Sequence, residues 1–455
     1  MQVFFYEKTG MHFGYEIIAA FAIEGGVCVL TSVPRGTKDI LPSEVGAWRY
    51  VEGVLRDLCR CFGFKEIRTP VFEHTELFQR GIGDTTDVVE KEMYTFIDRG
   101  KRSITLRPEN TASAVRAFIE HKMYAEPDPA KLFYIGPMFR YDRPQAGRQR
   151  QFHQFGVELL GAPGPNADAE IILLAVQILQ KLGLKDLQLK INTVGCPECR
   201  PAYRQKLQDY YRPHLEELCE DCRSRFDRNP MRILDCKNEK CHALAAGAPK
   251  LAECLDEDCK EHFAKVQELL TASGVDFVID PTLVRGLDYY TRTAFEIQYT
   301  PLGAQSAVLG GGRYDGLVEE VGGPATPGIG FAMGMERVIL ALESQNLLPA
   351  SDETIDVFAV APKPEAAVLA FTTVEKLREA GVCAAYDYQQ RSMKAQMKAA
   401  NRLNAKFVLI FGEDELSRNM VTLRDMTTED KDNNQREIPI AEIITILKTE
   451  VQKNE

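Results

Sequence analysis

The sequence predicts an α+β fold: a large domain that is interrupted by a cysteine-rich insertion and followed by a smaller α/β domain. Two strands, 131–140 and 151–160, flank a loop rich in Arg, Gln and Gly and predict a hairpin. Eight of the twelve cysteines fall between residues 196 and 259, which indicates a separate module. Beyond residue 355, apolar strands alternate with helical segments, a pattern that is typical of an α/β unit.

Composition and charge exclude several classes of protein. The chain has 455 residues, enough for two or three domains at roughly 150 residues each. No segment reaches the roughly 18 apolar residues that a membrane-spanning helix needs, so we expect no membrane partner. A net charge of -11 argues against a surface that coats nucleic acid regardless of sequence. Twelve cysteines without a secretory signal indicate a reducing, cytoplasmic location.

Residues 1–30 predict an N-terminal extension. Their apolar run, 17–23, is seven residues long, too short to span a bilayer or to form a signal core. Two alternatives stay open. The segment is either an ordinary peripheral strand or helix, or an artefact of a start site chosen upstream of a true start near residue 29 or 30.

The elements that follow are predicted from apolar spacing. Helical spacing predicts a helix over 48–62, which Gly63 ends, and then an extended segment, 64–69. After the hairpin, the pattern predicts a helix over 167–182 and a strand over 187–193. In the strand 151–160, alternation places one set of polar and aromatic side chains on a single face. These residues are Phe152, Gln154, Gly156 and Glu158.

The hairpin is basic in an acidic protein. Residues 131–155 have a local net charge of +4, from one acid, Asp142, and five bases: Lys131, Arg140, Arg143, Arg148 and Arg150. A solvated hairpin is the ordinary explanation of such a run. Here, however, Arg140 ends the first strand opposite the polar face of the second, so a cation, a ring and acceptors can converge. That combination suits a nucleotide phosphate beside a cationic small ligand.

The insertion has the cysteine spacing of a metal site. Cys196 and Cys199 form one CxxC pair, and Cys219 and Cys222 form another after 19 intervening residues. This spacing predicts a four-thiolate structural zinc site. Two CxxxxC pairs follow, and they could bind a second ion, replace one of the first pairs or stay unliganded: Cys236, Cys241, Cys254 and Cys259. Buried, unliganded thiols are the alternative for the whole module.

The C-terminal unit carries a basic stripe. Helices are predicted near 369–380 and 392–404. Four basic residues recur along the second helix at spacings of three and four: Arg391, Lys394, Lys398 and Arg402. A solvated helix face is one explanation, and contact with nucleic-acid phosphates is the other.

Several strings together resemble a known family. The strings MFRYDRPQAGRQRQFHQFGVELLG, LVRGLDYYTRTAFE, GGGRYDGL and GIGFAMGMERV occur in the order found in class II aminoacyl-tRNA synthetases, and within them histidyl-tRNA synthetases. The resemblance covers about residue 33 to the C-terminus. It implies an antiparallel-sheet catalytic domain over 31–195 and 276–345, an insertion over 196–275, a linker over 346–354 and an anticodon-binding domain over 355–455. It also implies a homodimer joined through the helix and strand that end at Pro70.

The same resemblance implies an activity and its residues. Members of the family join L-histidine to histidine tRNA through an adenylate formed from ATP, with magnesium on the phosphates. By analogy, Arg140 holds the α-phosphate, Arg337 the γ-phosphate, Phe152 stacks on adenine and Arg285 is catalytic. The residues that match histidine-binding positions are Glu109, Thr111, Arg140, Gln154, Glu158, Arg285, Tyr289 and Tyr290. The C-terminal stripe then corresponds to a tRNA-binding surface.

Two points limit the analogy. Asn110 stands where the family often has glycine, within the loop that supplies Glu109 and Thr111. The rival interpretation is a catalytically silent regulatory subunit of ATP phosphoribosyltransferase that resembles these synthetases. Such paralogues typically lack the C-terminal domain and depart from the LVRGLDYY motif, and this chain has both.

Overall fold

The computed structural model describes residues 32–83, 86, 88–145, 147–236, 238–301, 306–349, 354–428, 430 and 434–453. The predicted extension, 1–30, lies outside these residues. The chain divides into two compact units, which are treated separately below: one contains Glu52–Leu347, and the other contains Leu348–Glu455 together with Leu41–Val51. Within the described part, no helix has the length and apolar character needed to cross a membrane.

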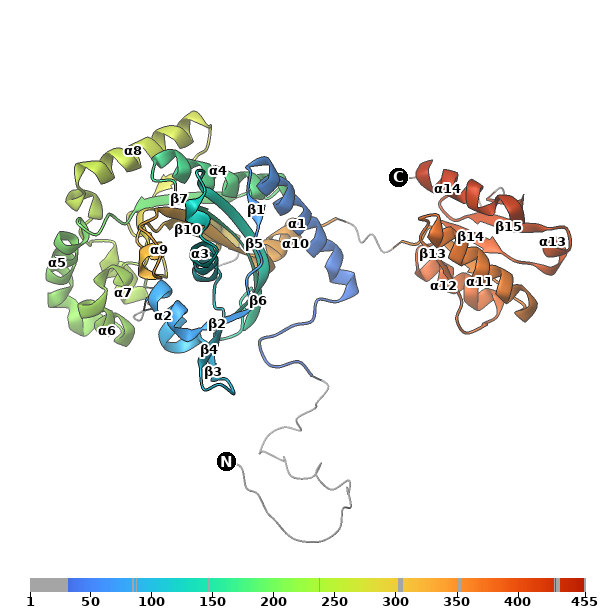
Figure 1. Cartoon of the computed structure of the whole chain (residues 1–455), viewed down its shortest axis with the longest axis horizontal. Coiled ribbons are helices and arrows are strands. Elements are labelled where there is room, and N and C mark those ends of the chain that lie inside the picture. The colour runs from blue at the N-terminus through green and yellow to red at the C-terminus, as the bar shows by residue number, and fades with distance from the viewer. Residues whose placement is uncertain are drawn as a thin grey trace, which may run out of the picture. The chain divides into compact units, whose positions relative to one another are not determined.

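The first unit is built on an eight-stranded sheet (Figure 1). The central strands pair antiparallel, while each edge strand pairs in parallel with its neighbour. In sheet order the strands are β1 (Lys65–Glu66), β5 (Ala130–Phe139), β6 (Gln151–Leu160), β11 (Gly328–Gly334), β10 (Ala307–Arg313), β9 (Thr291–Tyr299), β7 (Leu187–Thr193) and β8 (Val278–Ile279). The sequence therefore predicted β6 and β7 to the residue, and the α+β class is confirmed.

Helices α4 (Pro165–Lys181) and α10 (Met335–Ser344) pack against this sheet. The helix α4 begins with proline at its first turn, where the missing N–H costs nothing, and it packs against α8 (Glu257–Ala272). The helices α1 (Pro42–Cys61) and α10 precede β1 and follow β11 along the chain. The extended segment predicted over 64–69 is a strand only at β1, because pairing with β5 covers just two residues.

A small second sheet was not predicted. Its strands are β2 (Phe72–His74), β4 (Ser103–Leu106) and β3 (Tyr94–Ile97), in that order and antiparallel. It is followed by α3 (Thr111–Glu120), and α2 (Thr75–Ile82) packs on α3. The loop between β4 and α3 reaches the site described below.

The cysteine-rich segment is helical, and its buried core also includes Val284 and Ala294 from outside the segment. Its elements are α5 (Arg200–Tyr211), the 3₁₀ helices η4 (Arg212–Glu217), η5 (Pro230–Ile233) and η6 (Leu251–Cys254), and the helices α6 (Glu220–Arg228) and α7 (Glu239–Ala245). Tyr203, Leu207 and Tyr211 of α5 are buried together with Cys222, Cys236 and Cys241. Part of this core is therefore made of thiols rather than hydrocarbon side chains.

The second unit is a five-stranded mixed sheet with helices on both faces. The strand order is β13 (Ala384–Tyr386), β12 (Val357–Val360), β14 (Phe407–Ile410), β15 (Met420–Asp425) and β16 (Gln435–Pro439). The helices α11 (Pro364–Glu379) and α14 (Ile443–Lys453) share one apolar cluster with the sheet, and α12 (Met393–Arg402) shares the other. The predicted helix at 369–380 begins earlier, at Pro364, because proline is well suited to the first helical turn.

Candidate functional site

A cavity of about 790 Å³ opens in the first unit over the central strands. It collects residues from the β5–β6 hairpin, from β10 and from the start of α10. Of the residues expected to bind the substrates, five line it: Arg140, Phe152, Gln154, Arg285 and Arg337. Cys219 and Cys236 of the cysteine-rich segment line it as well. The structure thus brings together residues that lie nearly 200 positions apart.

Arg140 and Phe152 face each other across the hairpin. Phe139, the last residue of β5, pairs with Gln151, the first residue of β6. Arg140, which follows Phe139, therefore lies near the start of β6. The guanidinium carbon of Arg140 is 5.4 Å from the centroid of the Phe152 ring. The Nε of Arg140 donates to the carbonyl oxygen of Pro108 at 2.8 Å, which fixes the guanidinium beside the loop before α3.

Glu158 lies on β6, like Gln154, in a cage of hydroxyl groups, and it is not among the residues that line the cavity. Its carboxylate accepts hydrogen bonds from Thr111 Oγ1 at 2.8 Å, from the Tyr134 hydroxyl at 3.1 Å and from the Tyr314 hydroxyl. The side chain is 1% exposed, and this burial raises the pKa of Glu158 to about 8. With this pKa the carboxyl group is mostly neutral near pH 7, and a cationic group bound beside it would favour its ionised form.

Glycine makes room for this cage. A Cβ at Gly330 of β11 would collide with the carboxylate of Glu158 and with the carbonyl oxygen of Val157. A Cβ at Gly156 would likewise collide with the Tyr134 ring. Glycine inside a strand weakens it and commonly marks a close approach, which is its role here.

Glu109 holds the start of α3 through its carboxylate. Its carboxylate accepts the N–H groups of Thr111 at 2.6 Å and Ala112 at 3.0 Å, at the start of α3. Burial raises the pKa of Glu109. Glu109 holds the N-terminus of α3, and α3 in turn presents Thr111 to Glu158.

Asn110 fits the loop without the freedom of glycine. Its backbone φ is −121°, which any residue can adopt. Its Oδ1 accepts from Thr69 Oγ1 at 2.6 Å and from Arg107 at 3.0 Å. The residue therefore ties the loop to the segment that follows β1 and leaves both flanking residues in place.

Arg285 is held beside the cavity by an acid from the sheet. Its Nη1 forms an ion pair with Glu296 of β9 at 2.6 Å, and its carbonyl oxygen accepts from Arg232 at 2.6 Å. Its Nε is buried and has no hydrogen-bond partner among the residues that the structure describes. A Cβ at Gly310 of β10 would occupy the space of the guanidinium. The arginine is thus positioned, with donor capacity left for a ligand.

The two tyrosines of LVRGLDYY lie in contact with each other, with their rings tilted. The ring centroids of Tyr289 and Tyr290 are 4.6 Å apart, and Tyr289 is 5.6 Å from Tyr314. Neither lines the main cavity. Tyr290 instead lines a second cavity of about 370 Å³, which shares Arg285 and Arg232 with the first.

Arg337 closes the far side of the main cavity. It stands in the first turn of α10, and its Nη1 donates to the carbonyl oxygen of Ala307 at 2.6 Å. Burial and the nearby Arg148 lower its pKa. Arg148 and Arg337 repel each other, and an anionic ligand bound beside them would reduce this repulsion.

Three of the four cations of the basic stripe have no ion-pair partner among the residues that the structure describes. Lys394, Lys398 and Arg402 are exposed on α12, at intervals of four residues. Arg391 precedes the helix and is paired with Asp387 through its Nε at 2.7 Å. Asp387, the acid that pairs with Arg391, lies four residues before it in the chain.

The predicted four-thiolate set, Cys196, Cys199, Cys219 and Cys222, is wrong as one site. The structure separates the two CxxC pairs into different clusters. Cys219 and Cys222 gather with Cys236 and Cys241, and Cys196 and Cys199 gather with Asp256 and Cys259. The spacing of the two CxxC pairs suggested one site, but α5 and η4 lie between the pairs along the chain.

Sequence reasoning missed several partners of the site. Tyr134 and Tyr314 supply hydroxyls to Glu158, and Glu296 pairs with Arg285. The glycines in the strands could have indicated the two tyrosines, because a strand residue without a side chain leaves room for an aromatic ring to lie against the strand. Glu296 lies inside the quoted string LVRGLDYYTRTAFE, where alternation along the strand could have placed it on the cavity face.

Comparisons with known proteins show which sequences this chain is similar to. The family model described as Histidyl-tRNA synthetase matches residues 36–338, and the model described as Anticodon binding domain matches residues 356–450. A protein of Desulforamulus reducens named Histidine--tRNA ligase is 54% identical over 420 residues, covering 92% of this chain and 99% of its own. A protein of Pelotomaculum thermopropionicum with the same name is 57% identical over 398 residues, covering 88% of this chain and 94% of its own.

A solved structure is similar as well. The crystal structure of apo S. aureus histidyl-tRNA synthetase matches with a TM-score of 0.78 at 42% identity, covering 92% of this chain and 99% of that chain. The fold, the two domain types and the motifs of the cavity thus point to one family.

Proposed function

The chain belongs to the histidyl-tRNA synthetase family, and from that premise we propose how its residues carry out the ATP-dependent ligation of L-histidine to histidine tRNA. The observation that carries the proposal is the single cavity lined by Arg140, Phe152, Gln154, Arg285 and Arg337. It offers three arginines for phosphates, a ring for a base and an amide for an amino acid.

Adenylate formation needs positioned cations more than it needs a base. A carboxylate oxygen of histidine attacks the α-phosphorus of ATP, and the bond to the leaving pyrophosphate breaks as the new one forms. Arg140 and Arg285 stabilise the negative charge on the α-phosphate oxygens, and Arg337 binds the γ-phosphate. No protein base is required, because the attacking carboxylate is already ionised at neutral pH.

ATP is oriented by stacking and by a divalent cation. Phe152 stacks on the adenine, with Arg140 at its other side. Carboxylate oxygens suit magnesium, and Glu296 faces the cavity with a partly exposed side chain. Magnesium would be held there by Glu296 and the phosphates, and when bound it neutralises phosphate charge.

Histidine is recognised by residues other than those that hold the β- and γ-phosphates. Gln154 lines the cavity, and its Oε1 has no partner among the described residues, so it can accept from the ligand. Glu158 and Thr111 form the acidic floor, and Tyr289 and Tyr290 flank the imidazole. Arg140 and Arg285 also contact the histidine carboxylate. Glu109 acts at one remove, because its contacts hold α3.

The second unit binds the tRNA. Lys394, Lys398 and Arg402 meet phosphates of the anticodon stem, where contacts fix position rather than read sequence. After adenylation, the 3′-terminal hydroxyl of the tRNA attacks the carbonyl carbon of the adenylate and AMP leaves. We place this reaction in the cytoplasm, where tRNA and ATP are available.

We further propose a homodimer joined through the α1–β1 region. The small sheet that follows β1 supports it, since Phe72, Phe96 and Ile97 are 52%, 47% and 65% exposed. Neighbouring exposed apolar side chains commonly mark a protein contact. Sedimentation equilibrium, which measures the mass of the particle, tests this proposal directly.

The rival, a regulatory subunit of ATP phosphoribosyltransferase, is less supported. Relatives named histidine--tRNA ligase match nearly end to end, and the anticodon-binding model matches residues 356–450.

The test is histidine-dependent exchange of pyrophosphate into ATP. We expect Arg285→Ala to reduce exchange by at least about a hundredfold, because removing one preorganised donor to a transition state typically costs that much. Arg418→Ala, which removes an exposed arginine of the second unit, is the control and should exchange normally. Near-normal exchange by a folded Arg285→Ala protein would refute the catalytic role. Absence of exchange in the wild type would refute the function.

A further inference from the structure

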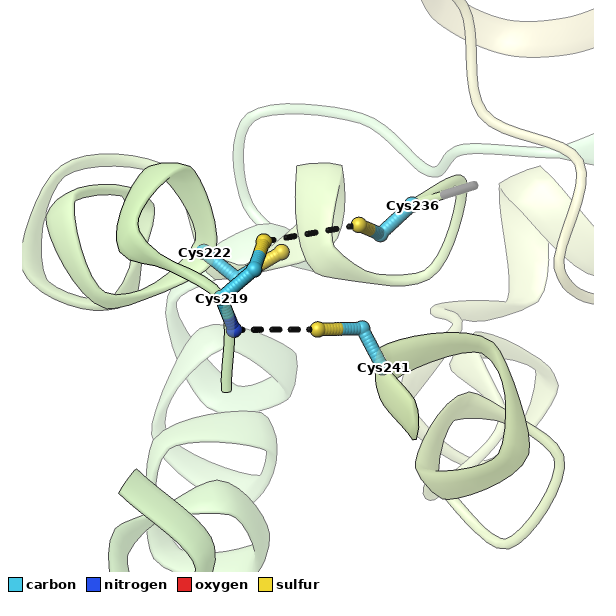
Figure 2. Close-up of side chains that lie close together, drawn as sticks. All are labelled: Cys219, Cys222, Cys236 and Cys241. Carbon is cyan, nitrogen blue, oxygen red and sulfur yellow. Dashed lines mark hydrogen bonds between the residues drawn. The ribbon is translucent and has the colours of Figure 1, made fainter. Parts of the chain in front are cut away.

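Four cysteines of the insertion converge on one point. Cys219 lies directly before α6, Cys222 in its first turn, Cys236 after η5 and Cys241 in α7. Figure 2 shows their sulfur atoms turned toward one another from three separate segments. All four sulfurs lie within 4.8 Å of one another, and those of Cys219 and Cys236 are 3.8 Å apart.

This spacing is that of a metal tetrahedron. Zinc–sulfur bonds of about 2.3 Å toward the corners of a tetrahedron place neighbouring sulfurs about 3.8 Å apart. A disulfide would need about 2.05 Å, and all four residues are free cysteines. The separation of 3.8 Å therefore fits shared coordination better than oxidation.

Burial and hydrogen bonding favour the same conclusion. Cys222 and Cys241 are fully buried, and Cys236 is 8% exposed. The backbone N–H of Cys219 donates to the sulfur of Cys241 at 3.3 Å, the kind of contact that orients a thiolate ligand. The flanking elements are short, since α7 has seven residues and η5 has four. Small modules of this kind usually need a staple beyond their apolar core.

From this geometry we propose that Cys219, Cys222, Cys236 and Cys241 bind one zinc ion. The ion is structural, because four thiolates leave no open position for water or substrate. It joins α6, η5 and α7, in addition to the apolar cluster that these elements share.

The site supports the catalytic segment at one remove. Arg232 of η5 lies between Cys222 and Cys236 and donates to the carbonyl oxygen of Arg285 at 2.6 Å. Asn229, just before η5, donates to Asp288 at 2.8 Å. The zinc ion therefore fixes the segment that braces LVRGLDYY. This consequence rests on the proposed function, whereas the metal site itself does not.

The second cluster gives an internal comparison. The thiols of Cys196 and Cys199 donate to Asp256 Oδ2 at 3.0 and 3.2 Å. Asp256 also caps α8, accepting the N–H of Cys259 at 2.7 Å. These groups already satisfy one another within the protein, so the proposal concerns the first cluster alone.

The test measures metal in full-length, tag-free protein, loaded with zinc and desalted without chelator. The Cys222→Ser, Cys241→Ser double variant should contain one zinc ion fewer per chain than wild type. The Cys196→Ser, Cys199→Ser variant should retain that ion, and Cys59→Ser controls for loss of a buried thiol elsewhere. A difference below about half an ion between wild type and the first variant would overturn the proposal.

A second measurement needs no variant, so it holds even if the double variant does not fold. Wild-type protein loaded with cobalt(II) should show the thiolate-to-cobalt charge-transfer and tetrahedral ligand-field bands of a four-thiolate site. An octahedral cobalt spectrum would overturn the proposal. So would disulfide-linked peptides joining these cysteines in freshly purified protein. None of these readouts depends on aminoacylation, so their failure leaves the proposed activity untouched.

Discussion

Glu158 has a pKa whose displacement makes a prediction about stability. Burial raises that pKa from 4.5 to about 8, so between these values the folded state keeps a proton that the unfolded state releases. The contribution of Glu158 to the free energy of unfolding is therefore fully present below about pH 4.5 and is lost as the pH rises toward 8. Glu158→Gln resembles the protonated acid and should remove this loss.

Urea unfolding at several pH values between about 5 and 8 measures the effect. The stability of wild type relative to Glu158→Gln should fall steadily across this range. Glu76→Gln, which removes an exposed acid of α2, should run parallel to wild type. Parallel curves for wild type and Glu158→Gln would mean that Glu158 is ionised in the free protein. The same variant should bind histidine more weakly, because its amide cannot pair with a cation.

The residues of the site show what a sequence can and cannot reveal. Phe152, Gln154 and Glu158 could be assigned to one face because a strand has a fixed period of two. Tyr314 could not be assigned to Glu158, since 156 positions separate them and only the sheet register unites them. The cysteine sets failed for the same reason: Cys222 meets Cys236 through folding of the module, which spacing does not encode.

At the scale of single elements, β11 depends on having no side chain at Gly330. Gly330→Ala would push against Glu158 and the backbone of β6, because the added Cβ has no free space. Overpacking of this kind costs about 1–3 kcal/mol, and displacement of Glu158 should also weaken histidine binding. Gly53→Ala is the matched control. It adds the same methyl group to an open position of α1, where nothing lies within 4 Å, and should stabilise the protein by about 0.5–1 kcal/mol.

Thermal unfolding and calorimetric histidine binding together check this prediction. Gly330→Ala should lose both stability and affinity, and Gly53→Ala should keep its affinity. Unchanged histidine affinity in Gly330→Ala would show that Glu158 does not need its observed position to bind the ligand.

Strongly periodic elements were predictable, and short or tertiary-determined ones were not. Alternation predicted β6 and β7 fully, and helical spacing predicted α4 to within two residues. The sheet of β2, β4 and β3 was missed because its strands have three or four residues, too few for a period to emerge. The helix predicted to 404 ends at Arg402, because Asn404 adopts a positive φ of 47°.

On the scale of the first unit, one buried ion pair joins three distant elements. Arg313 of β10 pairs with Asp168 of α4, and His262 of α8 contacts the same carboxylate at 3.2 Å. Burial alone would raise the pKa of Asp168, but the hydrogen bonds from His262 and Arg313 hold it below its usual range. Arg313 belongs to the string GGGRYDGL. Its position in that string reflects assembly of the unit rather than contact with a substrate.

The two units make separable contributions to the reaction, which the exposed cations of α12 can test. Replacing Lys394, Lys398 and Arg402 with glutamine should weaken tRNA binding and lower the slope of log affinity against log salt by about 2–3, since each of the three lost phosphate contacts removes a little under one unit. Pyrophosphate exchange without tRNA should not change, because the cavity lies wholly in the first unit.

The control replaces three lysines on the other face of the same sheet. Lys376 lies in α11 and Lys448 lies in α14, while Lys363 directly precedes α11. It matches the change in net charge, so a purely long-range electrostatic effect would weaken both variants equally and contradict a binding surface on α12. Filter binding over a salt series and steady-state charging measure the two quantities, and a loss of exchange along with charging would instead show that the triple variant is misfolded.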